Sequence, residues 1–85
     1  MNTTELLAER AKTHGDFSTH AFITQQIKAI MQDTDGWQYL SVSHRESLEM
    51  IAHKIGRILA GDPNHRDHWD DIAGYATLAA ERCKP

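Results

Sequence analysis

Acidic side chains are concentrated in the second half of the sequence, at spacings that can bring carboxylates together. Glu46 and Glu49 are three residues apart, and Asp67 and Asp71 are four apart. On a helix, either spacing places both members of a pair on one face. Two such pairs on adjacent helices can hold Mg²⁺, which prefers oxygen ligands and keeps several of its waters. A magnesium ion held there bridges phosphate oxygens and orients a water for hydrolysis.

Two basic residues lie between these acidic pairs and extend the hypothesis to a phosphate ligand. Lys54 and Arg57 can donate charge-assisted hydrogen bonds to phosphate oxygens. A second interpretation is equally physical, because the same charges can form the solvated face of an amphipathic helix. In that interpretation Asp71 is an ion-pair partner of Lys54 or Arg57, and Glu46 and Glu49 are favoured by the helix dipole. The sequence leaves both interpretations open.

The segment His14-Gly15-Asp16-Phe17 also has two interpretations. It can end one helix and start the next, with Gly15 at positive φ and Asp16 as an N-cap. It can also form a loop in which His14 lines a pocket. The chain has six histidines and one cysteine, Cys83, but no spacing that completes a zinc site.

Composition excludes several classes of protein. The net charge of −3 argues against non-specific nucleic-acid binding, which needs a basic face. No apolar run is long enough for a transmembrane helix, and the first residues do not resemble a signal peptide. A single cysteine rules out a disulfide scaffold within one chain. We therefore expect a protein of the cytoplasm that interacts with no membrane.

Helix signals divide the 85 residues into three to four helices of a single all-α domain, residues 1–85. Asn2 and Glu5 form a capping box that opens a helix through about Lys12. The later helices are expected to begin at Ser18 or Thr19, at Ser43, and near Asp67. We expect the last two helices to form a tight antiparallel pair.

Apolar spacing indicates which helix faces are covered. One face of the third helix is the expected core, and it carries Leu48, Ile51, Ala52, Ile55, Ile58 and Leu59. The last helix carries a second apolar stripe at Tyr75 and Leu78, which predicts a homo-oligomer. Two interior glycines, Gly56 and Gly74, are expected where the third and fourth helices approach closely.

Three segments together resemble a family of small phage and prophage proteins with no assigned function. They are His14–Phe17, the Lys54-x-x-Arg57 pair, and the run from Asp67 to Ala76, DHWDDIAGYA. More remotely, the chain resembles the all-α nucleoside triphosphate pyrophosphatases of the MazG and dimeric dUTPase type. Glu46-x-x-Glu49 matches the first half of their metal-binding pattern, whereas the second half departs from it.

The resemblance implies a phage-encoded protein that binds a nucleoside phosphate, or hydrolyses it with Mg²⁺, in the cytoplasm of the host. The alternative is a non-enzymatic accessory protein that sequesters a small nucleotide or binds and inhibits a host protein. The implied metal ligands are Asp71, Asp67, Glu49 and Glu46. The implied ligand-binding residues are Lys54 and Arg57 at phosphate, His14 at base or sugar, and in addition Asp16 and Tyr75.

Overall fold

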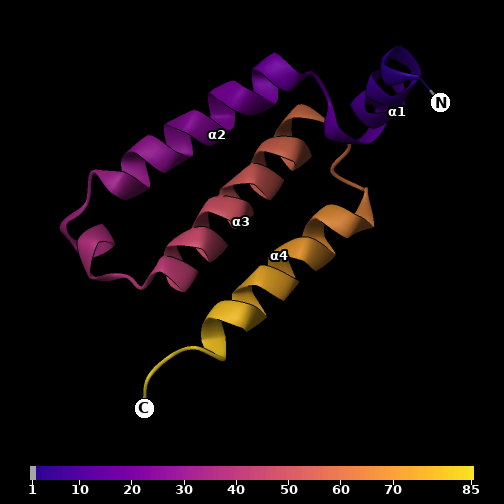
Figure 1. Ribbon diagram of the computed structural model, residues 1–85. Helices are drawn as coiled ribbons and strands as arrows, with labels where there is room; N and C mark the ends of the chain where they lie inside the picture. Colours follow the sequence, from indigo (N-terminus) through magenta and orange to yellow (C-terminus); the bar gives the residue numbers. More distant parts are fainter. Residues whose placement is uncertain (1) are drawn as a thin grey trace.

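The computed structural model describes residues 2–85, which form four α-helices and one short 3₁₀ helix. They are α1 (Thr3–His14), α2 (Phe17–Gln32), η1 (Asp35–Tyr39), α3 (Val42–Ala60) and α4 (Arg66–Ala80). In Figure 1, α2, α3 and α4 lie side by side in one layer with α3 in the middle, and α1 lies at one end of the layer. The expected all-α fold is confirmed, and α3 and α4 form the expected close antiparallel pair.

The N-termini of α1, α2 and α3 carry side-chain caps, whereas α4 has none at His65, and α2 and α3 begin earlier than the sequence predicted. Asn2 accepts a hydrogen bond of 2.8 Å from the Glu5 amide, which confirms the first capping box. Asp16, and neither Ser18 nor Thr19, caps α2. Ser41 caps α3 in place of Ser43. Each of these two caps accepts a hydrogen bond from the backbone amide three residues later in the chain, which is the amide that an N-cap side chain can reach.

The seams between neighbouring helices are polar. His20 and Thr24 of α2 are buried where α2 approaches α3, and Ser47 and Lys54 of α3 are buried as well. On the far side of α3, Lys54 forms a 2.9 Å ion pair with Asp71 of α4, and the His44 imidazole lies 2.9 Å from the carbonyl oxygen of Ala79. These paired polar groups fix how the helices align along one another.

The apolar stripes, in contrast, are poorly covered. Among residues 2–85 only two hydrophobic residues, Ala52 and Ile58, are buried. Leu48 is exposed, and Leu59 and Ile30 are 67% and 69% exposed. The stripe expected to be the core of α3 is therefore covered only in part: Ala52 and Ile58 are buried, and Ile51 and Ile55 are half-buried. Leu48 and Leu59 stay exposed because a single layer of helices has no second layer to pack against. No described helix has both the length and the apolar content that crossing a bilayer requires.

The two interior glycines do not lie where the sequence suggested. Gly56 is buried against α2, and a Cβ there would come within 2.5 Å of both the His20 ring and the Thr24 hydroxyl. Gly74 faces open space, since no atom would lie within 4 Å of its Cβ. The close approach that requires a glycine is thus between α2 and α3, whereas α3 and α4 are separated by longer side chains such as Lys54.

The backbone at Gly15 crosses the backbone at Gly61 in close contact, and this crossing holds α1 to the end of the layer. Gly15 follows α1 with φ of 76°, and its Cα faces the carbonyl group of Ala60 at the end of α3. Gly61 ends α3 with φ of −122°, which lies outside the left-handed region. Its Cα instead faces the backbone of Thr13 and His14. The Asp62 amide donates a 3.0 Å hydrogen bond to the Thr13 carbonyl, which secures the crossing.

Candidate functional site

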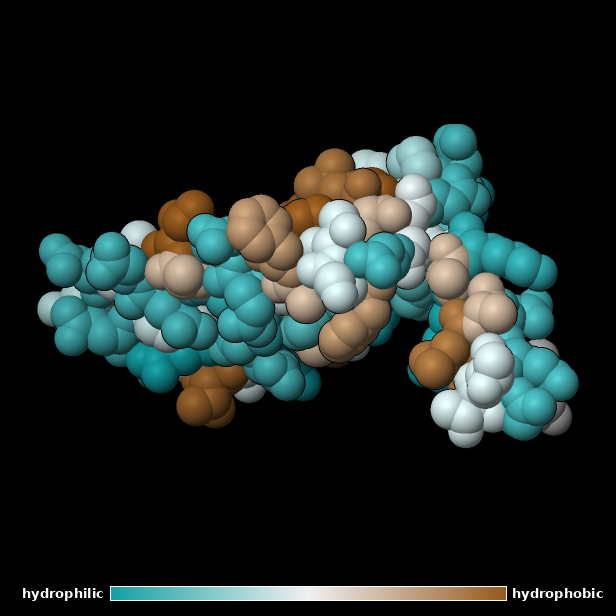
Figure 2. Space-filling model, turned by 90° about the horizontal axis from the view of Figure 1, so that it is seen from above, coloured by the Kyte–Doolittle hydropathy of each residue, from teal (hydrophilic) through white to brown (hydrophobic). Residues whose placement is uncertain are grey.

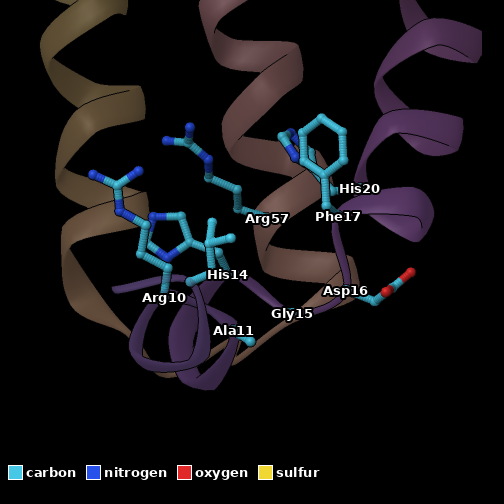
Figure 3. Close-up of a pocket in the computed structure, with 9 residues that line it drawn as sticks. Arg10, Ala11, His14, Gly15, Asp16, Phe17, His20 and Arg57 are labelled. Atoms are coloured by element: carbon cyan, nitrogen blue, oxygen red, sulfur yellow. The ribbon is translucent and has the colours of Figure 1, made fainter. Parts of the chain in front are cut away.

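A cleft of about 620 Å³ opens where α1, the start of α2 and the end of α3 meet. Its volume is within the range of small-molecule sites, which are roughly 300–1,000 Å³. Figure 3 shows the side chains that line it. They are Leu7, Arg10, Ala11, His14, Gly15, Asp16, Phe17, His20 and Arg57.

The cleft carries uncompensated positive charge. Arg10 comes from α1 and Arg57 from α3, and neither forms an ion pair with any residue of the described part of the chain. Asp16 is the one acid in the lining, but its carboxylate accepts hydrogen bonds from the amide and hydroxyl of Thr19. In Figure 3 that carboxylate points away from the two guanidinium groups. The cleft is therefore suited to an anion.

Histidines line the same cleft, and their surroundings disfavour protonation. Burial lowers the pKa of His14 and of His20, and the nearby Arg57 guanidinium lowers both further. The pKa of His53, whose ring packs against that of His20, is lowered by burial and then by Lys28. The Nε2 atom of His20 is buried and has no hydrogen-bond partner within residues 2–85. The wall of the cleft therefore holds imidazoles that are neutral near pH 7; His14 is half-buried, whereas the Nε2 atom of His20 is closed off from solvent.

The lowered pKa values of these histidines make the stability of the fold depend on pH. Unfolded histidine has a pKa of about 6.5, and the folded values of His14, His20 and His53 are lower. Below about pH 6.5 the unfolded chain therefore binds protons that the folded chain does not. We expect the free energy of unfolding to be highest above that pH, where neither state binds these protons. It should fall as the pH is lowered toward 5.5. The pKa of Asp71 is also lowered, but its contribution is lost only below about pH 4.

Urea unfolding at pH 7.5, 6.5 and 5.5 measures this effect, with His20→Gln as the comparison. The variant should lose less stability than the parent over the same interval, because one of the three groups is gone. Equal stability of the parent at pH 7.5 and 5.5 would contradict the prediction.

Asp71, the leading metal-ligand candidate of the sequence, is engaged elsewhere. Its carboxylate pairs with Lys54, and the lysine hydrogen bond and charge lower the pKa of Asp71. The Lys54 side chain is 9% exposed and that of Asp71 is 48% exposed, so the pair seals the edge of the α3–α4 seam. The ion-pair interpretation of Asp71 is the one that this contact supports, and Lys54 does not line the cleft.

The other acidic candidates are not brought together. Glu49 lies 3.6 Å from Lys28 of α2, whereas Glu46 is exposed on α3. Asp67 is exposed in the first turn of α4, 3.8 Å from the His65 ring, and Asp70 pairs with Arg66. Among residues 2–85 no three His, Cys, Asp or Glu side chains are placed to hold one metal ion. Magnesium binding stays a prediction.

Three of the five proposed ligand residues, His14, Asp16 and Arg57, do line the cleft. Both interpretations of the His14–Phe17 segment are met there, because Gly15 has positive φ, Asp16 caps α2 and His14 lines the cleft. Tyr75 lies apart, in a shallow depression with Leu78. Arg10 and His20 also line the cleft although the sequence did not predict it, and Phe17 was singled out only as part of the His14–Phe17 segment. Arg10 stands one helical turn before His14, and that spacing was the available signal.

The fold and the cleft define a small all-α protein with one open layer of helices and a basic, histidine-lined site at its end. The chain belongs to the family described as DUF6378, a domain of unknown function, whose model matches residues 2–83. Membership fits the resemblance to an uncharacterised family, whereas phage origin and similarity to the pyrophosphatases remain predictions. No curated protein and no solved structure matches the chain.

Proposed function

We propose that this protein binds a nucleoside phosphate in the cleft between α1, α2 and α3. The observation that carries the proposal is the pair Arg10 and Arg57, which come from different helices and face one cleft without an acidic partner in the described chain. Guanidinium groups bind phosphate through paired, charge-assisted hydrogen bonds. A single exposed arginine without an acidic partner costs little free energy and needs no ligand to explain it. Two unpaired arginines that face the same small cleft favour an anionic ligand.

Other lining residues suit the nucleoside part of the ligand. The Phe17 ring is 78% exposed at the first turn of α2, although its phenyl group is strongly apolar. A base can stack on such a ring, and stacking on an aromatic side chain is worth about 1–3 kcal/mol per base. His14 and His20 supply neutral imidazoles at the same wall. Phosphate is thus expected at the arginines and the base near Phe17.

We propose binding as the primary activity and keep hydrolysis with Mg²⁺ as a separate question. The acidic residues implied by the pyrophosphatase resemblance lie on α3 and α4, and Asp71 among them is paired with Lys54. Of the two residues that the resemblance implies at phosphate, Lys54 and Arg57, Arg57 is the one that lines the cleft. A protein that sequesters a nucleotide needs the cleft alone, whereas hydrolysis needs a metal or a base that activates water.

Calorimetric titration of the parent protein tests the proposal. The ligands are nucleoside mono-, di- and triphosphates of each base, with the free nucleosides and inorganic phosphate as controls, in EDTA and again with Mg²⁺. We expect a nucleotide to bind in EDTA more tightly than either its nucleoside or phosphate. Binding by none of them at near-millimolar concentration would remove the proposal and favour the protein-binding alternative. If phosphate or pyrophosphate is released from the nucleotide only when Mg²⁺ is present, the protein also hydrolyses the nucleotide that it binds.

A further inference from the structure

One broad surface of the helix layer is apolar, and its composition follows from how each helix is oriented. On α3, Glu49 and Gly56 face α2, whereas Lys54 and His44 face α4. At 100° per residue, the two remaining sides of α3 carry either Leu48, Ile55 and Leu59 or Glu46, Met50 and Arg57. One surface of the layer is therefore apolar at α3, and the opposite surface is polar and bears the cleft.

The flanking helices continue the same division. On α2, His20 and Thr24 face α3, which leaves Ile23 and Ile30 on one side and Gln25 and Gln32 on the other. On α4, Asp71 and Ala79 meet Lys54 and His44 of α3, so Ile72 lies on the same apolar side. We call this surface the apolar face; its residues are Ile23, Ile30, Leu48, Ile55, Leu59 and Ile72. Figure 2, which views the layer from above, shows hydrophobic side chains gathered mainly along the upper margin at mid-length.

The chain exposes more surface than its size requires. Its accessible surface is 6122 Å², whereas a compact monomer of 9.6 kDa has about 5,100 Å². Its radius of gyration is 14.5 Å, against about 12 Å for a compact chain of this length. The excess of about 1,000 Å² resembles the roughly 800 Å² that each partner buries in a stable protein–protein interface.

We propose that a second copy of this chain covers the apolar face, so that two helix layers pack into one dimer with a shared hydrophobic core. Domains are stable when two layers bury their apolar sides against each other, and one chain supplies a single layer. The six residues that define the apolar face are all isoleucine or leucine, so two chains of net charge −3 do not bring like charges together at these positions. The clefts lie on the opposite surfaces and stay open.

Sedimentation analysis over a range of concentrations tests this arrangement with a matched pair of leucine variants. Leu59→Ala removes an exposed side chain from the apolar face, and Leu78→Ala removes one that is 46% exposed beside Tyr75 on the other side of α4. We expect a dimeric parent, a dissociation constant at least tenfold higher for Leu59→Ala, and a change below twofold for Leu78→Ala. Alanine favours helices, and Leu59 and Leu78 are 67% and 46% exposed in the chain, so both variants should fold.

Three results would overturn the proposal. If the parent sediments as a folded monomer at 100 µM, a second copy does not cover the apolar face. The face is then covered by another protein or by α1, or it is not covered. Weakening by Leu78→Ala but not by Leu59→Ala places the interface on the Tyr75 side, as the second stripe on the last helix suggested. Equal weakening by both shows that neither face is specific. Nucleotide binding does not enter these readouts, so this proposal and the proposed function can fail separately.

Discussion

Gly15→Ala is expected to destabilise the protein by about 2–5 kcal/mol. Gly15 has φ of 76°, which L side chains rarely adopt, and a Cβ there would run into the carbonyl group of Ala60. The obstacle is backbone, so it cannot move aside as a flexible side chain would. Relief requires opening the crossing, which also breaks the hydrogen bond from the Asp62 amide to the Thr13 carbonyl. α1 would then be released from the layer.

Chemical unfolding followed by circular dichroism measures this cost, with Gly74→Ala as the matched control at the same protein concentration. Gly74 lies inside α4 and faces open space, so alanine there should stabilise the protein by about 0.5–1 kcal/mol through helix propensity. A Gly15→Ala change within about 0.5 kcal/mol of the parent, which is usual for surface sites, would show that the crossing is not tightly closed.

Arg57→Gln is expected to weaken nucleotide binding by about 10- to 100-fold, because a hydrogen bond to a charged group is worth about 1.5–3 kcal/mol. Glutamine keeps a polar but shorter side chain, and it removes the charge and the paired donors. Arg10→Gln should act in the same direction, since both arginines face one cleft. Binding should also become less sensitive to salt in each variant, because fewer charges meet the phosphate.

Arg66→Gln is the control for the loss of one positive charge. Arg66 is exposed on α4, pairs with Asp70 and does not line the cleft, so binding should be unchanged. Isothermal titration of the three variants with the best nucleotide of the panel gives the comparison. If Arg57→Gln and Arg66→Gln weaken binding equally, net charge attracts the ligand and the cleft is not its site.

The sequence predicted the fold class because each helix carries strong local signals, such as the Asn2 cap and the apolar spacing on α3. The predicted stripe contains both buried hydrophobic residues, Ala52 and Ile58, but the sequence did not predict that the rest of the stripe would be half-buried or exposed. Helical periodicity identifies the apolar side of α3, but the number of layers decides whether Leu48 and Leu59 are covered. Gly74 was misplaced for a similar reason, since an interior glycine does not reveal which neighbour it approaches.

The candidate site was predicted in part. His14, Asp16 and Arg57 line the cleft, because the segment that ends α1 is brought to the end of α3 by the glycine crossing. Helical spacing places Arg10 beside His14, but the approach of Arg10 and Phe17 to Arg57 depends on that tertiary contact. The carboxylates failed to converge for an electrostatic reason, because Lys54 and Lys28 are near enough to pair with Asp71 and Glu49.

The polar seams between the helices have a consequence for how the chain folds. Buried groups such as His20, Thr24 and Lys54 align the helices but contribute little hydrophobic free energy, and an isolated layer buries only Ala52 and Ile58 fully among its described hydrophobic residues. If the apolar face supplies the missing burial, the rate-limiting encounter in folding is between two chains. Refolding should then be a second-order reaction, with a half-time that shortens in proportion as the protein concentration is raised.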